Sequence, residues 1–410
     1  MQDDVGPDAG AEARAARGRQ ATRFLLLYAL AAAGGAIAYV PFLTILLPIQ
    51  VTALTGDADV AWLAYATFTG AVTASIANIA FGWLSDRTRT RRKWILSGLG
   101  LSCFLLILTS RVDSIGWLIV LVAVWQVALN MMLSPLAAWA GDSIPDRQKG
   151  MLGGLLSFSP AGGALAAAFI TLPGLAGPEG RLWLVAGLVS ICVLPAVLIG
   201  HPRRLPHLAP EPAGAEDGVE PRPDRSRVVV VRMWLARLLV QICEAALFAF
   251  LYFWFRTVDP AMTDARVAQI FSAILFVSVP LAIAVGRWTD AHARPFMPLY
   301  LTAGVSAVGL VVMAWSTSLG GAVAGYLLFG VAASIFLSLH TGQTLRVLPR
   351  ARNRGRDLGI FNLTNTGPSL IMPWLTLSLV PLFGFAGLFI ALAGCALLAS
   401  VLLMNLPRRA

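Results

Sequence analysis

Long apolar runs recur along the whole chain and constrain its fold more than any other feature. A helix needs about 20 mostly apolar residues to cross the hydrocarbon layer of a membrane. Twelve such runs occur, at approximately residues 23–48, 60–84, 94–111, 115–140, 151–173, 181–200, 232–256, 266–288, 297–317, 320–346, 357–381 and 384–406. With 57% hydrophobic and 13% charged residues, the chain is predicted to be an integral membrane protein.

The position of the basic residues predicts the orientation of these helices. A net charge of +10 would suggest nucleic-acid binding in a soluble chain, but most of the 31 Lys and Arg residues lie in alternate loops and at both termini. Basic loops stay in the cytoplasm. We therefore expect both termini inside the cell, in the plasma (inner) membrane, no nucleic-acid partner, and no cleavable signal peptide, since the N-terminal segment lacks an apolar core.

Composition divides the chain into five segments. Proline-rich, mixed-charge residues separate the sixth and seventh apolar runs, and such a composition cannot bury a core. The predicted segments are a disordered cytoplasmic tail at 1–22, a six-helix bundle at 23–200, a disordered cytoplasmic connector at 201–231, a second six-helix bundle at 232–406 and a short tail at 407–410.

A charged loop between the second and third apolar runs has a counterpart in the second half. Asp86 follows Gly82 by one helical turn and precedes a basic cluster; the same spacing recurs as Gly286 and Asp290, 204 residues later (286 − 82). A second landmark, the segment from Pro145 to Gly150, has a counterpart in the segment from Pro349 to Gly355. Two landmarks at nearly one offset indicate a duplicated half, as in many secondary transporters that bind substrate between their halves.

The charged loop resembles the loop between helices 2 and 3 of the major facilitator superfamily. The residues on the family pattern are Asp86, Arg87, Arg91 and Arg92, whereas Thr90 stands where the family has glycine. Ser85 and the basic tail look most like the sucrose and glycoside-pentoside-hexuronide symporter branch. The resemblance implies an all-α membrane protein with twelve transmembrane helices in two six-helix bundles.

The duplicated loops are expected to form two gates between the bundles. A carboxylate can bind the positive N-terminus of a helix, and glycine lets helices approach closely. We expect Asp86 to meet the helix start near Arg356 and Asp357, and Asp290 to meet the one near Gly150. The predicted gate residues are Gly82, Asp86, Arg87, Arg91, Arg92, Gly286, Asp290 and Arg294.

Ionisable residues at membrane depth point to a transport site. Glu244 lies about 18 Å along its helix from Arg232, and Arg237, Gln241 and Glu244 share one helix face. Glu244 either takes up a proton or binds a substrate hydroxyl, and Arg237 either tunes it or holds an anionic group; the alternative is a structural charge pair. The amides Gln126, Asn130, Asn362 and Asn365 can bind sugar hydroxyls but can equally be contacts between helices. His340 can relay protons near neutral pH, but a lone histidine is more often a structural hydrogen-bonder.

The predicted function is secondary transport of a small polar solute by alternating access, with a sugar or glycoside favoured as the solute. The sodium-coupled relatives carry acids in helices 2 and 4 where this chain has Asn78 and Gln126, which disfavours sodium coupling. The helix 4 arginine of many proton-coupled relatives is also missing, so the expected proton coupling rests on Glu244. Residues 159–163 resemble an exporter signature, so export of drug-like compounds stays an alternative, as does a non-transporting assembly or sensing role. We expect a monomer in the lipid bilayer, with no enzymatic activity, cofactor or metal, because no such motif occurs.

Overall fold

The computed structural model describes residues 18–55, 59–172, 174–203, 205, 227–262, 264–348 and 353–406. Helices account for the regular structure of these residues, and no strand occurs among them. Ten helical segments within this part of the chain are long and apolar enough to cross a membrane. The seventh and eleventh predicted runs also lie on helices. The prediction of an all-α membrane protein is therefore confirmed.

The first bundle contains the helices that precede the connector. Its first span is continuous through a π-helical turn, η1 (Phe42–Leu46). Its elements are α2 (Thr22–Pro41), α3 (Leu47–Thr55), α4 (Asp59–Thr88), α5 (Arg91–Leu108), α6 (Ile115–Ser143), α7 (Lys149–Leu156), α8 (Phe158–Ile170) and α9 (Pro178–Ile199), with short 3-10 turns η3 (Thr109–Arg111) and η4 (Asp146–Gln148). Its apolar core includes Phe42 packed edge-to-face on Trp125, with ring centroids 4.8 Å apart.

The second bundle repeats this arrangement. Its helices are α10 (Arg227–Val258), α11 (Asp264–His292), α12 (Met297–Trp315), α13 (Leu319–Val347), α14 (Arg354–Thr366) and α15 (Pro368–Met404). Gly384 interrupts α15 with φ +65°, a left-handed conformation that glycine adopts without strain. The kink lies at the first residue of the twelfth predicted run, so the second part of α15 corresponds to that run, and α14 with the first part of α15 corresponds to the eleventh.

Two predicted boundaries are wrong. The connector was expected to reach residue 231, but α10 begins at Arg227 because the run Val228–Val231 continues the apolar helix. The tail was expected to be disordered to residue 22, but Gln20 is 3% exposed and exchanges hydrogen bonds with Gln148 and with the backbone of Arg203. The remaining tail and connector predictions, at 1–17, 204, 206–226 and 407–410, lie outside the described residues.

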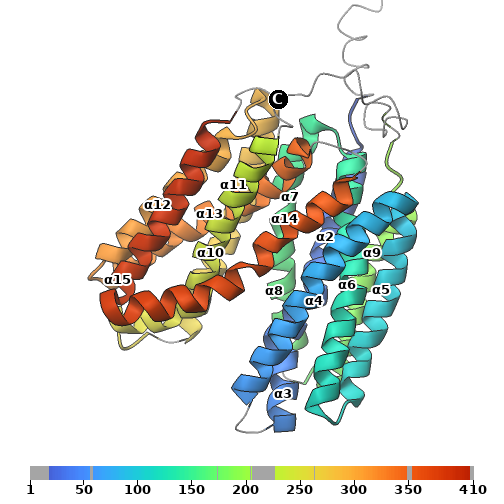
Figure 1. Cartoon of the computed structure of the whole chain (residues 1–410), viewed down its shortest axis with the longest axis horizontal. Helices are drawn as coiled ribbons and strands as arrows, with labels where there is room; N and C mark the ends of the chain where they lie inside the picture. The colour runs from blue at the N-terminus through green and yellow to red at the C-terminus, as the bar shows by residue number, and fades with distance from the viewer. Residues whose placement is uncertain are drawn as a thin grey trace, which may run out of the picture.

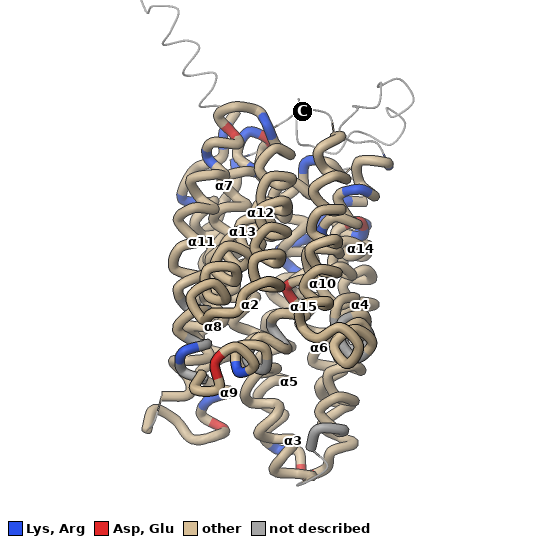
Figure 2. The backbone as a smooth tube through the Cα atoms, turned by 90° about the vertical axis from the view of Figure 1, so that its left-hand side faces the viewer, with Lys and Arg blue, Asp and Glu red and all other residues tan. Residues whose placement is uncertain are grey.

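The two bundles lie side by side, with α7 and α14 between them (Figure 1). The helices that meet across the bundles are α4 and α6 with α14, and α7 with α11 and α13. Lys and Arg gather toward the end of the molecule that carries the C-terminus (Figure 2). We call this end the basic end. The bundles are therefore joined where the duplicated charged loops lie.

Candidate functional site

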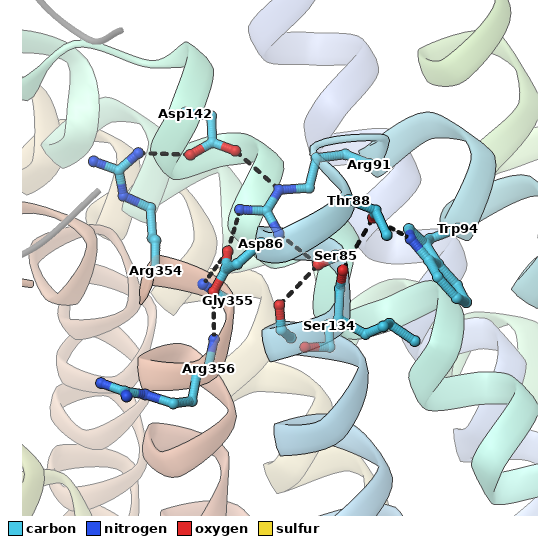
Figure 3. A network of polar contacts seen from close by, with 12 residues as sticks. Ser85, Asp86, Thr88, Arg91, Trp94, Ser134, Asp142, Arg354, Gly355 and Arg356 are labelled. Atoms are coloured by element: carbon cyan, nitrogen blue, oxygen red, sulfur yellow. Dashed lines mark hydrogen bonds and ion pairs between the residues drawn. The ribbon is translucent and has the colours of Figure 1, made fainter. Parts of the chain in front are cut away.

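Asp86 joins the two bundles at the basic end. It lies on the last turn of α4, and its carboxylate accepts hydrogen bonds from the backbone N–H groups of Gly355 (2.9 Å) and Arg356 (3.0 Å), at the start of α14 (Figure 3). Gly82 lies against Gly355, where a Cβ on either residue would overlap the other's backbone. The glycines thus permit the close approach that lets Asp86 satisfy two N–H groups that have no partner within the helix.

A chain of alternating charges extends from Asp86 (Figure 3). Arg91 pairs with Asp86 (2.5 Å) and with Asp142 (3.0 Å), and Asp142 pairs with Arg354 (2.7 Å). Asp142 belongs to the first bundle and Arg354 to the second. The Asp142–Arg354 ion pair is therefore a second electrostatic link across the interface. We call the contacts of Asp86, Asp142, Arg91 and Arg354 together the first gate.

Asp290 makes the equivalent contacts in the other direction. It lies on the last turns of α11 and accepts hydrogen bonds from the N–H groups of Gly150 (2.9 Å) and Met151 (2.7 Å), at the start of α7. Gly286 lies against Gly150 just as Gly82 lies against Gly355. The contacts that the sequence predicts for both aspartates are present, and we call this set the second gate.

Two cations of the second gate donate hydrogen bonds to backbone oxygens of the opposite bundle. Lys149 donates to the carbonyl of Leu345 (2.8 Å), and Arg346 donates to the carbonyl of Asp146. Lys149 also pairs with the Asp146 carboxylate (2.6 Å), and Arg346 lies 3.8 Å from Asp290. Both cations are almost fully buried. The Asp146 carboxylate therefore offsets the charge of Lys149, which lies near the cations Arg354 and Arg346.

Three predicted gate residues lie elsewhere. The guanidinium of Arg87 lies 5.7 Å from the ring centroid of Trp83 on its own helix. Arg92 donates to the carbonyl of Gly200 (2.6 Å), within the first bundle. Arg294 is exposed and contacts Met297 of its own bundle.

The structure adds five gate residues that the motifs do not predict, namely Asp142, Asp146, Lys149, Arg346 and Arg354. For two of them the sequence does offer a signal, because Lys149 and Arg354 each precede a glycine of the duplicated second landmark.

The second bundle presents one polar face toward the first, which we define as Arg237, Gln241 and Glu244 of α10 with Asn362 and Asn365 of α14. The Asn365 side-chain oxygen accepts hydrogen bonds from Gln241 (2.7 Å) and Arg237 (3.3 Å), and its amide nitrogen donates to Asn362 (2.8 Å). Asn365 is exposed, and the other four are partly exposed. The structure therefore brings these predicted site residues together on an accessible surface.

Glu244 has no hydrogen bond or ion pair with any described residue. It is partly exposed in α10, and no ion pair joins it to Arg237 within 4.0 Å. Its carboxyl is close enough to interact electrostatically with Arg237, Tyr39 of α2 and Tyr326 of α13. The described contacts therefore do not make Glu244 half of a structural salt bridge, and its carboxyl is accessible near Tyr39 of the opposite bundle.

His340 lies behind the polar face rather than on it. Its ring is fully buried, with Nε2 3.0 Å from the carbonyl oxygen of Met233 and Nδ1 3.1 Å from the hydroxyl of Thr344. Since only an N–H can bond a carbonyl, Nε2 donates and Nδ1 accepts. This arrangement favours the structural role for His340, holding α13 against α10.

Gln126 and Asn130 form contacts within the first bundle. Asn78 donates to the side-chain oxygen of Asn130 (2.8 Å), Asn130 donates to the carbonyl of Gln126 (2.9 Å), and Ser134 donates to the carbonyl of Asn78 (2.8 Å). All four residues are buried. These bonds favour the structural reading for Asn130, whose side chain joins α6 to α4, whereas Gln126 contributes only its backbone carbonyl to them.

Comparisons with known proteins agree with this architecture. The family model described as Major Facilitator Superfamily matches residues 24–339. No curated protein matches the chain.

Solved structures with the same fold include the human organic anion transporter MFSD10, at 15% identity and TM-score 0.70, covering 93% of this chain and 99% of that one. A bacterial homologue of the iron transporter ferroportin has 15% identity and TM-score 0.71, with 93% and 98% covered. The E. coli fucose:proton symporter FucP has 14% identity and TM-score 0.69, with 93% and 98% covered. At such identities the likeness shows the fold alone, whereas the family match spans most of the sequence; the chain belongs to the major facilitator superfamily.

Proposed function

We propose that this protein is a proton-coupled secondary transporter that moves a small polar solute across the inner membrane by alternating access. The observation that carries the proposal is Glu244, a carboxyl within the membrane that is accessible and has no described partner. A structural carboxylate at this depth would require a fixed partner. An accessible carboxyl can instead gain a proton when it faces one side and lose it when it faces the other.

The described conformation is proposed to be outward-facing. Both gates join the bundles at the basic end, which the positive-inside rule assigns to the cytoplasm together with both termini. The structures of the ferroportin homologue and of FucP are in outward-facing conformations, which agrees with this assignment. Opening of the two gates would then expose the polar face to the cytoplasm.

A sugar or glycoside is the favoured solute. The amides of Gln241, Asn362 and Asn365 can both donate and accept hydrogen bonds, which suits hydroxyl groups. Two structural neighbours are proton symporters of fucose and of xylose, and the charged loop resembles a sugar-symporter branch. Export is the second candidate, since residues 159–163 resemble an exporter signature.

Uptake into proteoliposomes under an imposed inward pH gradient tests the proposal. Glu244→Gln keeps the shape and hydrogen bonding of the protonated acid but cannot cycle a proton. We expect it to abolish uphill accumulation while preserving binding and exchange of solute for solute. Undiminished uphill transport in Glu244→Gln would exclude the coupling role, and loss of binding as well would assign Glu244 to substrate recognition.

A further inference from the structure

Arg237 is a guanidinium at membrane depth whose described partners are all neutral. Its Nη1 donates to the carbonyl of Leu337 (3.3 Å) and to the hydroxyl of Thr341 (3.0 Å), and lies 3.5 Å from Nδ1 of His340. Its Nη2 donates to the side-chain oxygen of Asn365 (3.3 Å). A cation at membrane depth normally acquires a carboxylate partner, and none is within ion-pair distance of Arg237 among the described residues.

These neutral partners hold Arg237 in place without cancelling its charge. Because His340 accepts through Nδ1, it supports the guanidinium as a neutral ring. Asn365 points its oxygen at both Arg237 and Gln241, so its own amide hydrogens are directed away, toward Asn362. The result is a fixed positive charge surrounded by hydrogen-bonding groups on an accessible face, which is the arrangement that binds an anion bearing hydroxyl groups.

Glu244 sets the net charge of this face. It lies about 10 Å from Arg237 along α10. The other titratable groups that interact electrostatically with Glu244 are Tyr39 of α2, Tyr326 of α13 and Cys243 of its own helix. A phenol and a thiol carry no charge in their protonated forms. With Glu244 ionised the face therefore carries one charge of each sign, and with Glu244 protonated it carries a single positive charge.

We infer that the transported solute is an organic monoanion with hydroxyl groups, such as a sugar acid, whose carboxylate binds Arg237 only after Glu244 has taken up a proton. This inference rests on the proposed coupling role of Glu244. One proton and one anion then cross together, so transport moves no net charge. Removing a negative charge about 10 Å from the bound anion strengthens its binding by roughly tenfold at an effective dielectric constant of about 20.

Matched pairs of a neutral sugar and its acid test the inference on the purified full-length protein. The probes are glucose against glucuronate and gluconate, and galactose against galacturonate, with binding measured at mildly acidic and mildly alkaline pH. We expect at least one acid to bind and the neutral sugars to bind far more weakly, with the acid's Kd roughly tenfold lower at the acidic pH. Equal binding of sugar and acid, or binding of none of the acids, would overturn the inference.

Variants separate the two charges. Glu244→Gln should bind the acid at alkaline pH as tightly as the unmodified protein does at acidic pH. Arg237→Gln should lose the acid, and Arg237→Lys, which keeps the charge, should regain part of the binding if the loss is not a folding defect. Arg232→Gln, on the same helix but bonded to the carbonyl of Asn405, is the control that should change neither. Binding of the acid that survives in folded Arg237→Gln would contradict the assignment.

Transport distinguishes failure of this inference from failure of the proposed function. Uptake of the acid should follow the pH gradient, yet should produce no current and be unaffected by membrane potential. Accumulation of a neutral sugar under the pH gradient would overturn the anion inference and leave proton-coupled transport standing. Uptake of the acid that ignores the pH gradient would refute both the coupling and the protonation step.

Discussion

Asp86 and Asp290 occupy equivalent positions in the two halves, and each accepts hydrogen bonds from two consecutive backbone N–H groups at the start of a helix in the opposite bundle. The charges around them are not equivalent. The first gate adds a carboxylate–guanidinium pair between Asp142 and Arg354, whereas the second brings two cations, Lys149 and Arg346, to the same interface. The two gates therefore respond differently to substitution.

Asp86→Asn should shift the protein toward the inward-open state. The amide loses the charge that interacts with the helix terminus and with Arg91, an interaction of about 0.3 to 2 kcal/mol for the terminus alone. A change of this size alters the ratio of two states by up to roughly thirtyfold. Distances between spin labels placed on the two bundles measure the shift. Asp113→Asn, an exposed aspartate far from both gates, is the control, and unchanged distances in Asp86→Asn would remove Asp86 from the gating role.

Gly82→Ala should prevent complete closure at the basic end. The added Cβ would overlap the backbone carbonyl of Gly355, and overpacking of this kind costs about 1 to 3 kcal/mol. The overlap with the Gly355 backbone exists only when α4 and α14 are in contact, and the other close atom is the hydroxyl of Ser134 (2.9 Å), a side chain that can shift. The folded protein should therefore persist while the closed state is depleted. Cysteine labelling from the cytoplasmic side should become faster. Gly100→Ala, where a Cβ would meet no atom within 4 Å, should label at the unmodified rate.

Asp146→Asn should open the second gate more than the first. Without this carboxylate, Lys149 keeps its carbonyl partner but loses the negative charge that offsets the nearby cations Arg354 and Arg346. In a nearly dry interface such charges repel more strongly than at the surface. The effect should exceed the roughly 0.2 to 1 kcal/mol of an exposed ion pair and, because the cations are buried, should depend only weakly on salt concentration. Accessibility of cysteines placed beside α7 and beside α14 compares the two gates directly. A larger change beside α14 would show that Asp146 does not control the second gate.

His340→Ala should lower stability without changing the pH dependence of uptake. The substitution leaves the carbonyl of Met233 and the hydroxyl of Thr344 without this partner in a buried position, at a cost of about 1 to 3 kcal/mol. Thermal unfolding in detergent measures the loss. Uptake by the remaining folded protein should keep the same pH profile, because the ring is held as a neutral hydrogen-bonding group. A displaced profile would instead assign His340 to the proton pathway.

Polar residues at helical spacing on α10 and α6 show what periodicity in the sequence can and cannot predict. Helical periodicity places Arg237, Gln241 and Glu244 on one face, and the structure puts that face toward the opposite bundle. The same periodicity places Gln126 and Asn130 on one face of α6, but that face is buried against Asn78. The pattern was equally consistent with a binding surface and with a helix contact, because it contains no information about which neighbour a face meets.

The membrane class, the duplicated halves and the positions of Asp86 and Asp290 can be predicted from the chain alone, since apolar length, internal offset and the glycine-to-aspartate spacing are local properties of the sequence. The charges that complete the gates depend on how the helices pack. Asp142 and Arg354 lie far apart in the sequence and meet because α6 and α14 pack together. Gln20 is likewise buried where it bonds to Gln148 and Arg203. Such pairs arise from helix packing across the whole fold, where the cost of burying each charged or polar group selects its partner.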